Sequence, residues 1–245
     1  MAIDLPGFIY HAMLALVVGE LICHFSHQSG LAIPLTWIRT LTALGGCIHI
    51  IFTAHRLPLY GPFESMALLN LILGGLCLVP APKTQNIPKA SRPLAIYSGG
   101  ILLVMMLLQI KGPLGLNRDY FMYADPTVIL FFHLRVLAAG IFIHGGCRYL
   151  AAATMGDKRF FHGGRNALLA GTCIYLGSEW NGSLWCLNWY GDSWHWSRGF
   201  FKAAILFLLV MAALHLPPNL IRHKWIRATA GSLPGLFMIW MLFYH

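Results

Sequence analysis

The sequence predicts an all-α polytopic membrane protein with about eight transmembrane helices. Hydrophobic residues make up 58% of its 245 residues and charged residues only 10%, whereas a soluble domain carries about 25% charged residues. The apolar residues form runs that are long enough for helices rather than for barrel strands. The cationic residues gather in alternate loops between these runs. So few charges could not cover a water-facing surface, which excludes a soluble domain.

Eight apolar spans follow one another along the chain. The first span lacks a small-residue cleavage site and precedes further spans, so we expect a retained helix rather than a signal peptide. Three spans are shorter than the roughly 20 residues that cross a bilayer; we expect them to extend into their flanks or to lie where the bilayer thins. We interpret 1–245 as a single integral-membrane domain, because no long linker divides it. The spans are 7–27, 35–55, 62–80, 95–111, 128–152, 166–180, 199–216 and 229–244.

The loops predict the orientation of the chain. Nine cationic residues lie in three alternate loops, and the positive-inside rule places these loops in the cytoplasm. The net charge of +9 is therefore assigned to topology rather than to a nucleic-acid partner. Both termini and the loops 56–61, 112–127 and 181–198 then lie outside, and we expect a bacterial-type inner membrane. The nine residues are Lys83, Lys89, Arg92, Lys158, Arg159, Arg165, Arg222, Lys224 and Arg227.

Tryptophan is concentrated in "SEWNGSLWCLNWYGDSWHW", the stretch 178–196. Five of the 8 tryptophans lie there, and an aromatic belt places only one or two at each helix end. We therefore predict a tryptophan-rich external loop between the sixth and seventh helices, within the segment 178–198. The 6 cysteines form neither CxxC nor CxxCH, which argues against covalently attached haem in this chain, a zinc knuckle and a dithiol redox site.

The 12 histidines fall at several depths of this topology. Ionisable groups inside a bilayer are costly, so each is either hydrogen-bonded within the structure or functional. Zinc requires three or four clustered ligands, but haem requires only one or two axial histidines and an apolar aromatic surround. We therefore favour haem b, one or two molecules. The placed histidines are His11, His49, His133 and His245 near the outer side, His144 at mid-depth, and His24 and His215 toward the inner side.

Four segments, taken in order, resemble a known family. "RLPLYGPFESMALLNLIL" is similar to a "PxxNxYES" segment that opens a helix, and "FFHLRVLAAGIFI" to an "HVxxxxxxYAAF" helix start. "GSLWCLNWYGDSWHW" resembles a "WGxxWxWDxxE" external loop, and "FLLVMAALHLPPN" a "YAIYLHxR" helix. These segments belong to the haem-handling membrane proteins of cytochrome c assembly, the CcsA, ResC and CcmC group. The resemblance spans roughly residues 35–245.

The resemblance implies a haem b held at the outer face, toward the periplasm or its equivalent, for export to or attachment onto an apocytochrome c. It implies that two external histidines ligate the iron, that a third lies within the membrane, and that the tryptophans stack on the ring. An arginine near the loop would pair with a propionate or snorkel to the interface. The implied residues are His133, His245 and His215, Trp185, Trp189, Asp192 and Trp194, and Arg198 or Arg135.

One departure from the family bears on function. The family's "WDPKE" is not intact, because Ser193 and Trp194 follow Asp192. The chain could therefore be a component of a holocytochrome c synthase, or it could export or chaperone haem. In each case we expect a second membrane subunit. Two other readings remain. One is a membrane cytochrome b that carries electrons between quinone and an external multihaem cytochrome or reductase; the other is a haem-free structural or transporter subunit. Glu64 would cap a helix N-terminus or contact the haem edge.

Overall fold

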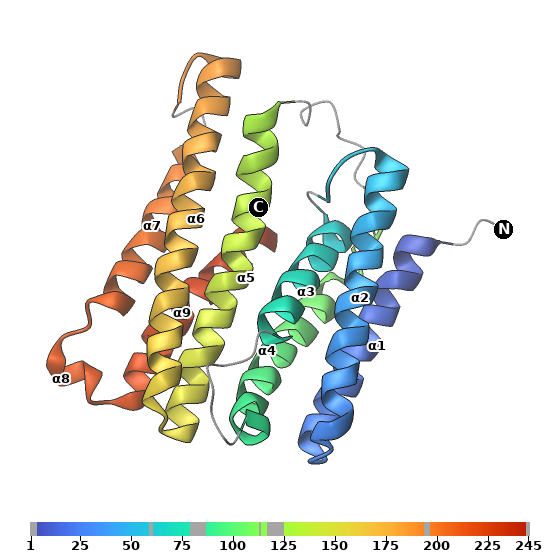
Figure 1. Ribbon diagram of the computed structural model, residues 1–245. Coiled ribbons are helices and arrows are strands. Elements are labelled where there is room, and N and C mark those ends of the chain that lie inside the picture. The colour runs from blue at the N-terminus through green and yellow to red at the C-terminus, as the bar shows by residue number, and fades with distance from the viewer. Residues whose placement is uncertain are drawn as a thin grey trace. The chain divides into compact units, whose positions relative to one another are not determined.

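The computed structural model describes residues 4–58, 61–78, 87–112, 114–116, 125–193 and 197–243. All of the regular secondary structure in these residues is helical. The expectation of an all-α protein is confirmed, and a long helix overlaps each of the eight predicted spans (Figure 1). The helices are α1 Leu5–Phe25, α2 Ser29–Ala54, α3 Pro62–Leu78, α4 Ile87–Gln109, α5 Pro126–Met155, α6 Lys158–Tyr190, α7 Ser197–Leu214, α8 Pro218–Ile221 and α9 Lys224–Phe243.

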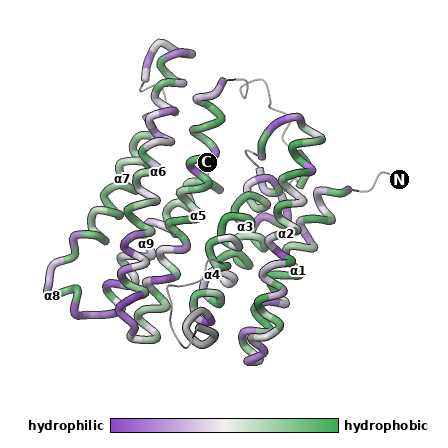
Figure 2. The backbone as a smooth tube through the Cα atoms, viewed as in Figure 1, coloured by the Kyte–Doolittle hydropathy of each residue, from purple (hydrophilic) through white to green (hydrophobic). Residues whose placement is uncertain are grey.

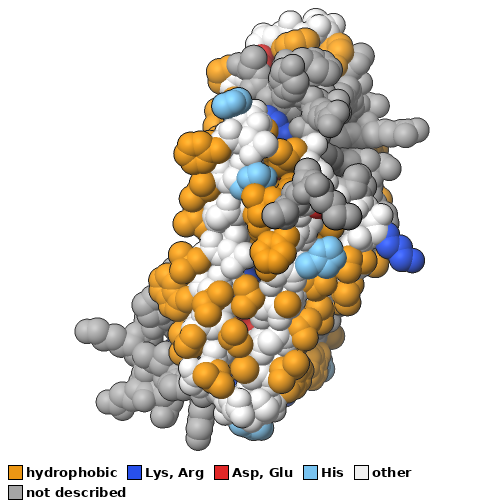
Figure 3. Space-filling model, turned by 90° about the vertical axis from the view of Figure 1, so that its right-hand side faces the viewer, with side chains coloured by type: hydrophobic (Ala, Val, Ile, Leu, Met, Phe, Trp, Pro, Cys, Tyr) orange, Lys and Arg blue, Asp and Glu red, His pale blue; other side chains and the backbone are white. Residues whose placement is uncertain are grey.

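Among the residues that the structure describes, four helical segments are long and apolar enough to cross a membrane: Leu5–Phe25, Gly30–Ala54, Arg92–Gln109 and Pro126–Met155. Two shorter apolar helices, Pro62–Leu78 and Gly199–Leu214, accompany them. Hydrophobic residues run along most helices in Figure 2, and on the face shown in Figure 3 hydrophobic side chains are far more numerous than charged ones. A surface of this kind suits contact with lipid rather than with water.

The chain divides into two compact units, Met1–Asp119 and Tyr120–His245. In the first unit, α1 packs against α2 and α4, and α2 packs against α3. Its interior is partly polar. The Arg39 Nε donates to Glu20 Oε2 at 3.0 Å, the Arg39 Nη1 donates to Asn70 Oδ1 at 3.0 Å, and each of the three side chains is at most 1% exposed. A charged network therefore joins α1, α2 and α3 inside this bundle.

In the second unit, α5 packs against both α6 and α9, and α7 packs against α9. Small residues allow this close approach of the helices, as is usual between membrane helices. A Cβ atom at Gly235 of α9 would lie 3.0 Å from the backbone oxygen of Phe142 in α5. Because that contact is with backbone rather than with a flexible side chain, α9 can approach α5 this closely only through a glycine.

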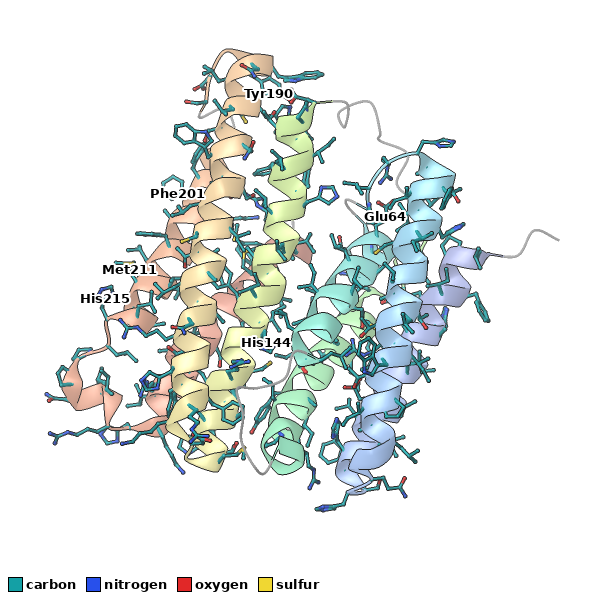
Figure 4. All side chains as sticks on the ribbon, in the orientation of Figure 1. Glu64, His144, Tyr190, Phe201, Met211 and His215 are labelled. Atoms are coloured by element: carbon teal, nitrogen blue, oxygen red, sulfur yellow. The ribbon has the colours of Figure 1, made fainter. Side chains whose placement is uncertain are left out.

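The predicted external tryptophan loop is wrong for most of its length. Helix α6 continues without a break through 181–190 and ends at Gly191, whose φ is +71° and whose N–H donates to the Leu187 oxygen at 3.0 Å. Gly182 does not interrupt the helix; a Cβ there would lie 2.6 Å from the Phe131 ring, so the glycine admits that ring against α6. In the sequence "NWYGD", residues 188–192, the helix ends at Tyr190, at the top of α6 in Figure 4, and the chain turns at Gly191. Residues 194–196 lie outside the described part of the chain.

Candidate functional site

An aromatic cluster joins the start of α5 to the end of α6. The Trp185 ring lies 6.1 Å from Phe131, 6.5 Å from Phe132 and 6.4 Å from Tyr190, measured between ring centroids. Only 1% of Trp185 is exposed. Ring pairs at these distances and tilted angles are typical of packed cores. Trp185 therefore lies within the helix interface, whereas the sequence predicted that it stacks outward on a ligand.

The other described tryptophans of this segment are exposed, Trp180 to 69% and Trp189 to 53%. They are nine residues apart on one helix, so they project from roughly opposite sides of α6. The Trp189 indole donates to Asp125 Oδ2 at 3.3 Å. Trp180, Trp185 and Trp189 thus do not form one continuous platform, and a flat ligand would contact them singly.

Asp125 anchors this end of the unit. Its Oδ1 accepts from the Thr127 backbone N–H at 2.8 Å and from the Thr127 hydroxyl at 2.7 Å, and these bonds cap the N-terminus of α5. The same two bonds, with the weaker one from Trp189, hold the pKa of the Asp125 carboxyl below its usual value. The cap and the Trp189 contact therefore depend on one carboxylate.

We expect acid to weaken the cap of α5 and the contact between Asp125 and Trp189. A carboxyl whose folded-state pKa is depressed contributes stability above its unfolded pKa of about 3.9, and this contribution falls as the pH drops through the folded pKa. The expected change is small because the group is exposed. Tryptophan fluorescence of the purified protein should shift in that window. Asp125→Asn should remove the shift, while Asp157→Asn, at the cap of α6, should retain it; an unchanged shift in Asp125→Asn would contradict the assignment.

An ion pair lies next to the aromatic cluster. The Arg135 Nη2 donates to Glu179 Oε1 at 2.5 Å, and the Arg135 guanidinium carbon lies 4.2 Å above the centre of the Phe131 ring. Both ionic side chains are less than a fifth exposed. Arg135, proposed from the sequence as a partner for a propionate, is thus already engaged by Glu179.

A small cavity adjoins this pair and is lined by residues of α5, α6 and α7 that include Arg135, Glu179, Trp185 and Cys186. Its volume is about 50 Å³, enough for a few waters but far too small for a porphyrin. Burial, with the nearby carboxylates of Asp192 and Glu179, raises the pKa of the Cys186 thiol. The thiol is therefore neutral and a poor ligand for a metal.

His133 combines a fixed tautomer with a ring nitrogen that makes no hydrogen bond to the described residues. Its Nδ1 lies 2.6 Å from the Ile129 carbonyl oxygen, one turn earlier in α5. Because a carbonyl can only accept, Nδ1 carries the proton and Nε2 carries the lone pair. This Nε2 is buried and has no hydrogen-bond partner among the described residues. A ligating histidine is usually oriented in this way, by a carbonyl bonded to its other nitrogen.

His144 is the informative contrast. It lies 11 residues after His133 on the same face of α5, about 16 Å farther along the helix, and is 4% exposed. Its Nε2 accepts from the Arg148 Nε at 2.8 Å, so its proton is on Nδ1, which has no partner in the described part of the chain. His144 (Figure 4) therefore presents a donor rather than a lone pair and, as bonded, does not fit a metal ligand.

His215 is not brought near His133. It follows the last residue of α7 and is exposed, with Nδ1 3.1 Å from the Met211 oxygen. Figure 4 shows it in line with Met211 and Phe201 along α7. Helices α5 and α7 run in the same direction, and His133 lies near the start of one while His215 follows the end of the other. The two rings are thus roughly 15 Å or more apart along the helix axes and cannot share one iron.

The remaining predicted site residues are placed only in part. Asp192 is exposed, just beyond the end of α6. Arg198 belongs to the first turn of α7, but its side chain lies outside the described residues, as do Trp194 and His245. No group of three or more His, Cys, Asp or Glu side chains among the described residues is arranged to hold a metal ion.

Two buried ion pairs of the first unit were not predicted from the sequence. One is Glu20–Arg39, and the other joins Glu64 to Arg56, whose Nη1 and Nη2 donate at 2.6 and 2.8 Å. Glu64, fully buried in the first turn of α3 (Figure 4), thus has an arginine partner as well as a capping position. The available signal was the presence of Glu20 and Arg39 inside apolar spans, where an ionisable residue needs a partner.

Comparison with known proteins identifies no relative: no family model, curated protein or solved structure matches the chain.

Proposed function

We propose that this chain is a haem-handling membrane protein of cytochrome c assembly, which binds haem b at the end of the second unit that carries His133. It would export or chaperone haem, or attach it to an apocytochrome c together with a second membrane subunit. The haem would face the periplasm or its equivalent, across a bacterial-type inner membrane. His133 would be an axial ligand, with His245 as its predicted counterpart.

The observation that carries the proposal is the buried Nε2 of His133. A buried polar atom without a partner costs about 1–3 kcal/mol, so such atoms usually have a partner when the protein is complete. The hydrogen bond from Nδ1 to Ile129 supplies the correct tautomer for iron. Haem needs only one or two such ligands, which suits a structure whose described residues lack a larger cluster of ligands.

The packing limits where haem can bind. The cavity beside Trp185 is too small to enclose it, so haem would lie against the surface of the unit rather than inside this cavity. Trp180 and Trp189 are both exposed, but they project from opposite sides of α6, so one of the two rings at a time would contact the edge of the haem. A cargo that is held loosely at a surface suits transfer to a partner better than permanent retention does.

Deleting the gene tests transfer. We expect holocytochromes c to disappear from the cells, to return with the wild-type chain, and to stay absent with His133→Ala expressed at the same level. His162→Ala is a matched control, because this exposed ring has the same Nδ1 contact with a carbonyl four residues earlier, at 2.9 Å. Normal holocytochrome levels in the deletion strain would contradict the proposal.

The second candidate is a cytochrome b that transfers electrons between quinone and an external multihaem cytochrome. The placement of His133 and His144 on one face of α5 favours it, because two haems at two depths would suit electron transfer across the membrane. The bonding of His144 to Arg148 disfavours it, since Nε2 is already used. Tightly bound haem that quinol reduces, in a fixed ratio to a redox partner, would select this candidate over the first.

A further inference from the structure

We propose that the second unit contains a binding site for the phosphate head group of an anionic phospholipid, at the end opposite His133. A cavity of about 80 Å³ opens there, lined from every helix of the unit by Tyr149, Arg165, Leu214, Leu216, Ile221 and Arg227. It combines two guanidinium groups with an apolar wall. This is the chemistry of an amphiphile with an anionic head, and it goes beyond the proposed handling of haem.

Arg165 and Arg227 have no carboxylate partner among the described residues. Neither is in an ion pair with a carboxylate of the described residues. Both arginines line the same cavity of about 80 Å³, together with Tyr149, so the two cationic side chains lie close to one another. Two cations that converge in this way repel one another. An anion placed between them would remove that cost.

The geometry of Arg227 leaves its hydrogen-bond donors available. Its guanidinium carbon lies 4.2 Å above the centre of the Phe161 ring. Stacking of this kind uses the face of the guanidinium and leaves the N–H groups at its edge free for a planar pair of oxygens. A phosphate presents such a pair, and arginine binds it through two parallel hydrogen bonds.

Few acidic residues of the second unit are placed to neutralise the cavity. Asp157 is the sole acidic residue in 126–178, and 193–245 contains none. Its Oδ1 is already used, accepting from the Arg159 backbone N–H at 2.9 Å to cap α6. Figure 2 shows the hydrophilic turn around α8 and the start of α9, where the exposed Arg222 and Lys224 add positive charge.

The apolar wall selects a lipid over a free phosphate ion. Leu214, Leu216 and Ile221 line the same cavity. They lie at or beyond the end of α7, whose surface is apolar, with Phe201 74% and Leu208 66% exposed. An acyl chain would lie along this surface while the phosphate enters between the arginines. The positive-inside rule places this end on the cytoplasmic side, where basic pockets between membrane helices bind anionic head groups.

Native mass spectrometry of the full chain in detergent tests the site with three additives: phosphatidylglycerol, phosphatidylcholine and inorganic phosphate. We expect one phosphatidylglycerol to stay bound at collision energies that remove phosphatidylcholine. The double variant Arg165→Gln/Arg227→Gln should lower the affinity for phosphatidylglycerol about tenfold or more, because both cationic contacts are lost. The control Arg222→Gln/Lys224→Gln removes the same charge at the same end but leaves the cavity intact, and should bind as the wild type does.

Three outcomes would overturn the proposal. One is equal retention of the two lipids, and another is an equal loss of affinity in the control variant, which would show diffuse attraction. The third is displacement of phosphatidylglycerol by inorganic phosphate, which would assign the site to the free ion. The helical circular dichroism of each variant is compared with that of the wild type as a check of folding. Arg227→Lys keeps the charge but lacks the paired N–H donors of a guanidinium, so it should bind phosphatidylglycerol with intermediate affinity.

Discussion

Replacing Arg39 with leucine should destabilise the protein by about 3–5 kcal/mol, because it leaves the Glu20 carboxylate buried and unpaired. The guanidinium bonds both Glu20 and Asn70, and all three side chains are enclosed by the first unit. Removing one member of such a network costs more than the network itself contributes, since the remaining charge keeps its desolvation penalty. The free energy of unfolding, measured by steric trapping in mixed micelles, is the quantity to compare.

A second substitution separates the two parts of this effect. Glu20→Met added to Arg39→Leu removes both charges and should restore most of the lost stability, because apolar residues can replace a buried pair at little cost. Arg222→Leu, in the exposed turn before α9, is the control and should change the stability by no more than about 0.5 kcal/mol. A double variant as unstable as Arg39→Leu alone would show that the charge itself has a role, beyond packing.

Substituting His133 with alanine should remove haem from the purified protein. Among the described histidines, His133 alone combines a carbonyl bond on Nδ1 with a buried Nε2 that has no hydrogen-bond partner in the described part of the chain. Loss of even about 1.4 kcal/mol of binding free energy lowers affinity tenfold, and an axial bond to iron exceeds that. Haem content per chain, compared by absorbance at the Soret band, should fall to the background level.

His144→Ala is the matched control on the same face of the same helix. We expect it to keep its haem, because the Nε2 of His144 is used by Arg148 and its Nδ1 carries the proton. Equal loss of haem in both variants would point to general damage of α5 or to the two-haem alternative. His133→Gly with added imidazole distinguishes damage to α5 from loss of the ligand. Imidazole can restore haem binding only if the site is intact apart from the missing histidine ring.

The helices could largely be predicted from composition and hydrophobic runs. The predicted span 7–27 corresponds to Leu5–Phe25, and 128–152 to Pro126–Met155. The extension of α6 to Tyr190 could not, because "NWYGD" is compatible with both a helix and a turn, and the sequence does not show that Gly182 packs against the Phe131 ring within a continuous helix. The length of an apolar span does not show which residues of two helices touch.

The residue types of the candidate site could be predicted from the sequence, but their arrangement in space could not. The position of Ile129 one turn before His133 can be read from the chain, yet the burial of Nε2 is a property of the folded structure that no local sequence pattern shows. The same limit explains the ionic residues. Arg135 lies in an apolar span, and nothing local tells whether its partner is a propionate or Glu179, which is 44 residues away. Pairings of this kind depend on which helices face each other.

The most direct test of the central claim is the haem content of the purified wild-type chain, measured as the pyridine haemochrome together with its optical spectrum. We predict haem b bound without covalent attachment, at close to one per chain, with a Soret band that is lost in His133→Ala. A folded preparation that contains no pigment, even after expression with excess haem, would contradict the account.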